Sequence, residues 1–240
     1  MAAIQYRPPK ANVPAAREGL EEIVGAAARG GARLIVAPEM STTGYIWPDA
    51  ETIRPHTETA DGPTAAMLGK IAAKHDAWIV AGFAEDAGEH LYNSCWVIGP
   101  SGELEGVYRK VLLFDADLTW ASAGTEHQRY TTDFGTLVPG ICMDINDDRF
   151  VQHVRDSETD IVAFCTNWID EGSDVIPYWR WRLARWRGWF VAANTWGMDG
   201  ETPFLGRSCV LPPESPPARV ALRCGDTIVY GETGSGSLYA

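Results

Sequence analysis

Cys142 stands where a cysteine can act as a nucleophile. It follows the extended run Thr136-Leu137-Val138 and precedes a polar segment typical of a helix start. At such a junction, backbone N–H groups can hold an oxyanion, and the positive end of the helix dipole favours a thiolate. Free cysteines are also among the most buried residue types, so an inert thiol packed at a strand end is the alternative.

Two charged residues could assist this thiol. Glu39 follows the apolar run Leu34 to Ala37 and a proline, and partial desolvation after a buried strand raises a carboxyl pKa towards the range of a general base. Lys110 closes an expected strand and could place a fixed cation beside a thiolate and an oxyanion. Taken singly, each charge is more often a solvated side chain.

The elements that must position these residues are strands buried on both faces, alternating with helices. Apolar runs predict strands at residues 2–6, 34–37, 78–83, 92–98, 104–108, 136–138, 161–165, 190–194, 208–211 and 218–222. Helical spacing predicts helices at residues 16–27, 63–75 and 150–154, and one that carries Trp179, Leu183, Trp186 and Phe190. This alternation fits two packed sheets covered by helices.

The last of these helices is rich in arginine and aromatic residues, a composition that could suggest stacking on RNA or single-stranded DNA. The acidic chain and the helical spacing favour an amphipathic helix whose arginines pair with the excess acids. The arginines concerned are Arg180, Arg182, Arg185 and Arg187.

The composition describes a globular chain of 240 residues, 45% of them hydrophobic, and its length suits a single domain covering residues 1–240. No apolar run approaches the roughly 20 residues of a membrane helix, and no signal peptide opens the chain, so we expect neither a membrane partner nor secretion. The net charge of −12 argues against nucleic acid and anionic membranes as main partners.

The cysteines and histidines argue against disulfides and metals. Five cysteines, an odd number without CxxC pairs, favour a reducing compartment and hence a cytoplasmic location. We expect four slow-reacting thiols in apolar strand contexts: Cys95, Cys165, Cys209 and Cys224. No pair has HxxxH or HExxH spacing, so no metal site is expected among His56, His75, His90, His127 and His153.

Several short stretches together make the chain similar to one known family. They are Leu34 to Glu39, Thr43-Gly44-Tyr45, Tyr92-Asn93-Ser94, Tyr108-Arg109-Lys110, Gly140-Ile141-Cys142-Met143-Asp144, Thr166-Asn167-Trp168, Val191-Ala192-Ala193-Asn194 and Phe204 to Ser208. In this order they resemble the nitrilase superfamily of carbon–nitrogen hydrolases over nearly the whole chain. The resemblance implies an α/β fold, a four-layer α-β-β-α sandwich of the nitrilase type, with no cofactor.

The resemblance also implies a homodimer or higher homo-oligomer that associates through a helix layer. Family members usually continue past the segment Gly234 to Ala240 into another strand and a tail. Without these parts, the usual dimer contacts would be in question.

By this resemblance, Glu39 matches the general base, Lys110 the catalytic lysine and Cys142 the nucleophile. The Met143 N–H would hold the oxyanion with Lys110. Tyr45 belongs to one of the matching loops, and Asn167 and Trp168 lie at the carboxyl end of an expected strand, where α/β sheets place their ligands. We expect these three residues to contact the substrate.

Asp117 departs from the family pattern. The family commonly carries a second glutamate where this chain has Asp117, seven residues before Gly124. The shorter side chain could orient Lys110 or the substrate, near the edge of the pocket. Together with Trp120, Phe150 and the stretch around Cys142, it resembles the branch that contains protein N-terminal amidases.

Three hypotheses follow from these residues. The leading one is an amidase that releases ammonia from a primary amide through a cysteine thioester, acting on a small molecule or on N-terminal Asn or Gln of a peptide. A nitrilase or N-carbamoyl amide hydrolase differs only in the group attacked. A catalytically silent binding scaffold of the same fold is the third.

An acidic cluster after the nucleophile bears on the substrate. If these acids rim the pocket, they attract a substrate amine and repel a carboxylate; otherwise they are helix caps and solvated charges. The acids are Asp144, Asp147, Asp148, Asp170, Glu171 and Asp174.

Overall fold

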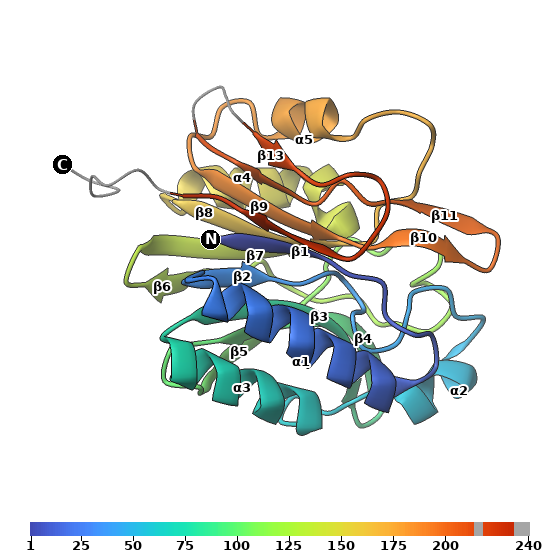
Figure 1. The fold of residues 1–240 in the computed structure, drawn as a ribbon. Coiled ribbons are helices and arrows are strands. Elements are labelled where there is room, and N and C mark those ends of the chain that lie inside the picture. Colours follow the sequence, from blue (N-terminus) through green and yellow to red (C-terminus); the bar gives the residue numbers. More distant parts are fainter. Residues whose placement is uncertain (214–217, 233–240) are drawn as a thin grey trace.

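Apolar strands form the two central layers of the computed structural model, which describes residues 1–213 and 218–232 (Figure 1). Residues of β2 (Leu34–Val36) and β8 (Ile161–Thr166) are buried throughout. Because side chains of a strand alternate between its two faces, such strands need cover on both sides. The second sheet covers one face and helices the other, so the expected four-layer α-β-β-α sandwich is confirmed.

The first sheet has the order β14-β1-β2-β3-β4-β5. Its centre is parallel, because β2 pairs with β1 and β3 in the same direction, whereas β4, β5 and β14 join antiparallel. Helices α1 (Val13–Arg29) and α3 (Pro63–His75) cover its outer face (Figure 1). The remaining bounds are β1 (Ala2–Gln5), β3 (Trp78–Ala87), β4 (His90–Ile98), β5 (Leu104–Arg109) and β14 (Thr227–Tyr230).

The second sheet has the order β13-β12-β9-β8-β7-β6. Here β7, β8 and β9 run parallel, so their carboxyl ends meet at one edge. Helices α4 (Asp148–Asp156) and α5 (Ile176–Arg182) cover the outer face (Figure 1). The strand bounds are β6 (Tyr130–Thr132), β7 (Gly135–Ile141), β9 (Trp189–Asn194), β12 (Cys209–Leu211) and β13 (Arg219–Val220).

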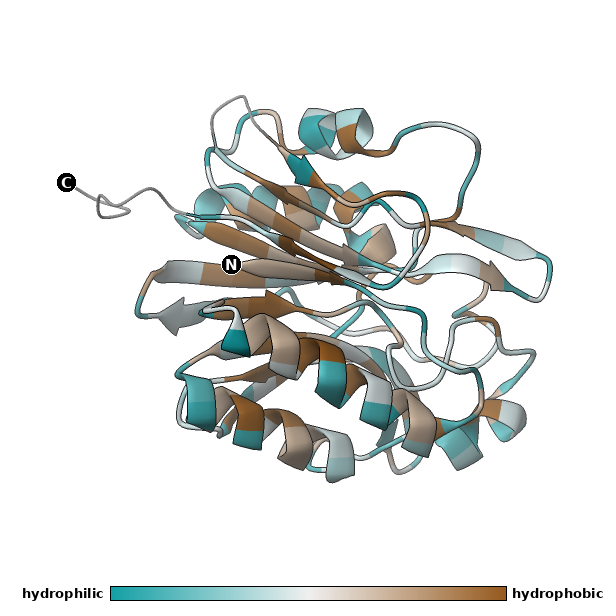
Figure 2. Ribbon diagram, in the orientation of Figure 1, coloured by the Kyte–Doolittle hydropathy of each residue, from teal (hydrophilic) through white to brown (hydrophobic). Residues whose placement is uncertain are grey.

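Hydropathy follows these layers. Figure 2 shows brown, apolar residues along the central strands and an alternation of brown and teal on the helices. Leu34, Val80, Ile141 and Ala163 belong to the core that the two sheets share. The sheets are therefore held together mainly by the removal of apolar surface from water.

Short elements lie around these layers. They are α2 (Ala50–Ile53), the 3₁₀ turns η1 (Arg54–His56) and η2 (Cys142–Asn146), and the hairpin of β10 (Trp196–Asp199) with β11 (Thr202–Leu205). Within the described ranges, none of the helices has the length and apolar character needed to cross a bilayer. The segment Gly234 to Ala240, beyond which family members usually continue, lies outside the described residues.

The predicted helix through Phe190 is wrong in its second half. Helix α5 ends at Arg182, and Phe190 lies in β9, where it pairs with Val162 of β8. The aromatic pattern nevertheless has a physical basis, because Trp179, Leu183 and Phe190 pack into one core cluster. The expected ion pairing is present for Arg182, which lies 2.8 Å from Asp148.

The predicted setting of Cys224 is also wrong. The expected strand at 218–222 is reduced to Arg219–Val220, and the chain then turns before β14, so Cys224 is exposed. The other four cysteines are buried, and all five are free thiols.

Candidate active site

Close packing between two segments of the first sheet places Glu39. The residue follows β2 and one proline, and the N–H of Gly82 donates to the Pro38 carbonyl at 3.1 Å. A side-chain carbon at Gly82 would lie 2.5 Å from the Glu39 Cα, nearer than any side chain allows. Only glycine permits this approach, which turns Glu39 into the interior instead of towards solvent.

The Glu39 carboxylate is fully buried, and both its oxygens are hydrogen-bonded. Oε1 accepts from Lys110 Nζ at 2.7 Å and from Asn93 Nδ2 at 2.7 Å, and Oε2 accepts from the Asn167 N–H at 2.8 Å. A buried carboxylate with donors of this kind is held in one orientation. The two charged residues expected beside the nucleophile therefore contact each other directly.

Asp117 completes this buried charge cluster. Its Oδ2 lies 2.6 Å from Lys110 Nζ, and its Oδ1 accepts from Asn93 Nδ2 at 3.0 Å. Asp117 is fully buried and does not line the cavity, so it lies deeper than the expected position at the pocket edge. Its contacts favour the first of the two roles considered for it, the orientation of Lys110.

The pKa values of the cluster follow from burial and charge. Burial raises the pKa of Glu39, and the nearby charge of Lys110 offsets only part of that rise. Burial lowers the pKa of Lys110, but Asp117 and Glu39 outweigh this and hold it well above its usual value. Two carboxyl groups share one ammonium, so the cluster favours gaining a proton and Glu39 has the character of a base.

Cys142 begins η2 directly after β7 and has a φ of 43°, in the left-handed region that non-glycine residues rarely adopt. Burial raises the pKa of its thiol to about 12, the charge of Glu39 adds to the rise, and Lys110 opposes it. Burial therefore acts against the thiolate that the helix N-terminus was expected to favour. The five-residue η2 turn has too little dipole to offset the desolvation of a buried sulfur.

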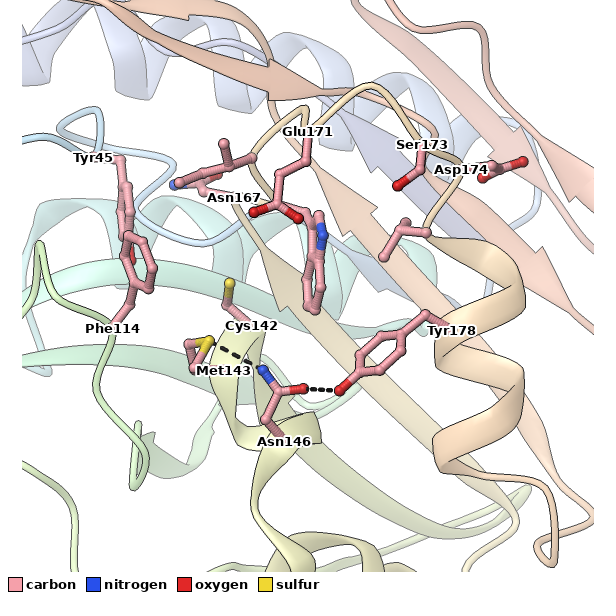
Figure 3. Close-up of a pocket in the computed structure, with 13 residues that line it drawn as sticks. Tyr45, Phe114, Cys142, Met143, Asn146, Asn167, Glu171, Ser173, Asp174 and Tyr178 are labelled. Atoms are coloured by element: carbon pink, nitrogen blue, oxygen red, sulfur yellow. Dashed lines mark hydrogen bonds between the residues drawn. The ribbon is translucent and has the colours of Figure 1, made fainter.

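The Cys142 sulfur points into a cavity of about 400 Å³ (Figure 3). Tyr45 and Phe114 stand on one side of it and Tyr178 on the other. The Tyr178 hydroxyl donates to Asn146 Oδ1 at 2.5 Å, and Asn146 donates to the Met143 sulfur at 3.1 Å. Cys142 is thus accessible from a site large enough for a small molecule or a peptide terminus.

Four residues expected to bind substrate line this cavity with Cys142, namely Tyr45, Met143, Asn167 and Trp168. Sequence reasoning missed Phe114, Asn146 and Tyr178, which also line it. Asn146 lies four residues after Cys142, so the spacing of one helical turn could have identified it. Asn93, which also had no role assigned, could have been noticed as a polar side chain within a largely buried strand.

The acidic residues after the nucleophile differ in whether they form ion pairs. Asp147, Asp148, Asp170 and Asp174 form ion pairs with Arg149, Arg182, Arg223 and Arg207, at 2.7 to 2.8 Å. Asp147 also caps α4, as the alternative expectation held. Glu171 lines the cavity, and within residues 1–213 and 218–232 it has no ion-pair partner. Asp144 is fully buried and does not line the cavity, so its expected place on the pocket rim is wrong. Of the two acids that do line the cavity, Glu171 and Asp174, Glu171 is therefore the one without an ion pair in the described ranges.

The described residues contain no group of three or more His, Cys, Asp or Glu side chains placed to hold a metal ion. Cys142 lines the cavity, and the charges of Glu39 and Lys110, which are fully buried and do not line it, act on its thiol. Such an arrangement permits covalent attack on a carbonyl or nitrile carbon.

Comparison with known sequences agrees with this chemistry. The sequence model of the carbon-nitrogen hydrolase family matches residues 1–227. A probable nitrilase of Schizosaccharomyces pombe is 33% identical over 190 residues, which cover 75% of this chain and 67% of that protein. The protein N-terminal amidase of the same yeast is 26% identical over 223 residues, which cover 75% and 78%.

Solved structures share the fold at lower identity. A cysteine-to-alanine variant of a Nesterenkonia amidase from the nitrilase superfamily matches with a TM-score of 0.82 and 17% identity, over 95% of this chain and 87% of that one. An N-terminal amidase in complex with an Asn-Glu-Ala peptide matches with a TM-score of 0.75 and 16% identity, over 87% and 88%.

Proposed function

This chain belongs to the carbon-nitrogen hydrolase family, and from that premise we propose that it is an amidase that releases ammonia from a primary amide through a thioester on Cys142. The observation that carries the proposal is the buried Glu39–Lys110 pair, 2.7 Å apart, whose charges act on a thiol that opens into the cavity. A base, a cation and a nucleophile at one place are what acyl transfer requires.

In the first half-reaction, Glu39 takes the thiol proton as the Cys142 sulfur attacks the amide carbon. A base is needed because a thiol with a pKa of about 12 carries almost no thiolate at neutral pH. Lys110 and the Met143 N–H stabilise the oxyanion that forms on the carbonyl oxygen. Protonated Glu39 then gives its proton to the nitrogen, the C–N bond breaks and ammonia leaves.

In the second half-reaction, Glu39 takes a proton from water, which attacks the thioester. The C–S bond breaks, the Cys142 sulfur regains the proton and the carboxylic acid leaves. Dividing one difficult hydrolysis into two easier steps is the benefit of the covalent route. The role of Asp117 is to keep Lys110 charged and in place, through the 2.6 Å contact.

The substrate of this amidase carries an amine near the amide, as an N-terminal Asn or Gln residue or an amino-acid amide does. Glu171, the cavity acid without an ion pair among the described residues, would attract the ammonium group. The similarity to proteins named N-terminal amidase, one of them bound to a peptide that begins with Asn, supports this reading. The expected cytoplasmic location and homo-oligomer stay predictions.

Ammonia release tests the proposal. The wild-type protein and Cys142→Ala would be incubated with amino-acid amides, peptides with N-terminal Asn or Gln, nitriles and ureido acids. We expect ammonia from the amides with wild-type protein alone. Release from nitriles alone would favour the nitrilase activity that the name of the yeast relative suggests, and no release from any substrate would favour a silent scaffold.

A further inference from the structure

Asp144 has four hydrogen-bond donors within reach of one buried carboxylate. Oδ1 accepts from the N–H groups of Val111 at 3.0 Å and Leu112 at 2.9 Å. Oδ2 accepts from the N–H of Ile141 at 2.9 Å and from the Tyr108 hydroxyl at 2.7 Å. Asp144 is fully buried and does not line the cavity. These four donors, and not a ligand, therefore satisfy the hydrogen-bonding capacity of its carboxylate.

These donors flank two of the proposed catalytic residues. Tyr108, Val111 and Leu112 lie immediately around Lys110, and Ile141 immediately precedes Cys142. Lys110 follows β5 of the first sheet, whereas Cys142 follows β7 of the second. Among the described residues, no backbone hydrogen bond joins the two segments, because they belong to different sheets. The hydrogen bonds of the Asp144 side chain therefore connect the Lys110 and Cys142 segments, which the hydrogen bonds between strands do not. We call this connection the joint.

The joint also acts on a strained backbone. A left-handed non-glycine residue such as Cys142, with φ of 43°, is strained and persists only where its surroundings hold it. Asp144 accepts from the N–H immediately before Cys142, within the same turn. Without this contact, the turn is free to relax, and the sulfur moves relative to Lys110 and Glu39.

Tyr108 extends the joint towards α4. Its single hydroxyl proton is donated to Asp144, so its oxygen accepts from His127 Nδ1, 3.0 Å away. His127 Nε2 in turn lies 3.5 Å from Asp147, which caps α4. The Tyr108 hydroxyl thus links the Asp144 carboxylate to His127.

We propose that Asp144 is a positioning residue that holds the Cys142 turn in register with the Lys110 segment across the two sheets. The proposal rests on the amidase function inferred above. Asp144 touches no substrate and acts through Cys142 and Lys110. Its loss should reduce the rate of chemistry and the reactivity of the thiol more than it weakens substrate binding, because a small displacement of a reacting atom is costly to rate.

Asp144→Asn is the informative variant. In either orientation of the new amide, its NH₂ group faces backbone N–H donors: Ile141 in one case, Val111 and Leu112 in the other. We expect kcat to fall at least about tenfold, with KM changed less than about threefold. We expect alkylation of Cys142 by iodoacetamide, followed by mass spectrometry in a Cys224→Ser background, to slow by a similar factor.

Glu58→Gln provides the matched control. Glu58 is a buried carboxylate whose two oxygens accept from the N–H of Thr64 at 2.9 Å and from its hydroxyl at 2.6 Å, at the start of α3. Its loss should lower the melting temperature but leave kcat and Cys142 alkylation within about twofold of wild type. Equal kinetic losses in both variants, in step with their melting temperatures, would reduce Asp144 to a general stabilising residue and overturn the proposal.

Tyr108→Phe keeps the test open if Asp144→Asn does not fold. This variant removes one donor and leaves three, so we expect an intermediate slowing of alkylation, about threefold to tenfold. Unchanged alkylation in every folded variant would overturn the proposal. Alkylation needs no turnover, so a wild-type protein that releases no ammonia would contradict the amidase function and leave the role of Asp144 to be decided by thiol reactivity.

Discussion

Lys110 Nζ lies 2.6 Å from Asp117 Oδ2, so a carboxylate one methylene shorter than glutamate still reaches the lysine. Phe114 donates its backbone N–H to the same oxygen at 2.9 Å, which draws the loop after Lys110 inward. These contacts support the proposed role of Asp117 in the charge balance and placement of Lys110.

Asp117→Asn should lower kcat/KM by about a hundredfold or more, because the buried ammonium of Lys110 loses one of its two carboxylates. Steady-state ammonia release measures this change. Asp86→Asn, which breaks an exposed ion pair with Arg54 at 3.2 Å, is the control and should leave kcat/KM within about twofold. A kcat/KM near the wild-type value in Asp117→Asn would remove Asp117 from the site.

Cys142→Ala should abolish turnover and change the melting temperature by only a few degrees, because alanine leaves a small void in a position that opens onto the cavity. Mass spectrometry after iodoacetamide treatment provides the complementary measurement. Cys224 is exposed and must first be replaced by serine. In that background we expect Cys142 to be modified before Cys95, Cys165 and Cys209, and activity that survives its modification would contradict the assignment.

Glu39→Gln tests the buried base through stability. Burial raises the pKa of Glu39 in the folded protein, so the stability that its protonated form supplies is complete below its ordinary pKa of 4.5 and is lost as the pH rises through the folded value. Glutamine does not titrate. The melting temperature of Glu39→Gln minus that of wild type should therefore increase from pH 5 to pH 8, while turnover is lost at both.

Calorimetry or circular dichroism at matched ionic strength checks this difference. The melting temperature of the wild-type protein over the same pH range reports any pH dependence that arises elsewhere in the chain. A difference between Glu39→Gln and wild type that stays constant or shrinks as the pH rises would show that the Glu39 pKa is not raised by folding.

Glu171→Gln should weaken recognition of a substrate amine. With wild-type protein, acetylation of the α-amine should lower kcat/KM at least tenfold, about 1.4 kcal/mol of lost transition-state binding. In Glu171→Gln the free and acetylated substrates should differ by less than about threefold. Asp170→Asn, whose carboxylate pairs with Arg223, should keep the wild-type preference. Equal rates for the two substrates with wild-type protein would remove amine recognition altogether.

Much of the fold could be predicted because burial leaves a pattern along the chain. The apolar runs at residues 34–37 and 161–165 correspond to β2 and β8, since strands covered on both faces carry mostly apolar side chains. The helix through Phe190 was wrong because strand and helix residues that meet in one core cluster can also repeat at helical spacing. Local periodicity does not distinguish the two.

The site was predictable in its charged residues and less so in its surroundings. Glu39, Lys110 and Cys142 lie far apart along the chain, and only the resemblance brought them together beforehand. The contacts of Asn93 and Asp144 could not be predicted, because their side chains form hydrogen bonds between segments that no local sequence pattern reveals. The raised pKa of the Cys142 thiol could not be predicted either, because desolvation depends on the packing of both sheets.

The two sheets divide the proposed catalytic set between them. Glu39 and Lys110 follow strands of the first sheet and Cys142 follows a strand of the second. A chain that has formed either sheet alone therefore carries a thiol without a base, or a base without a thiol. During refolding, the recovery of enzymatic activity should therefore report the time at which the two sheets dock. We expect activity to return later than secondary structure.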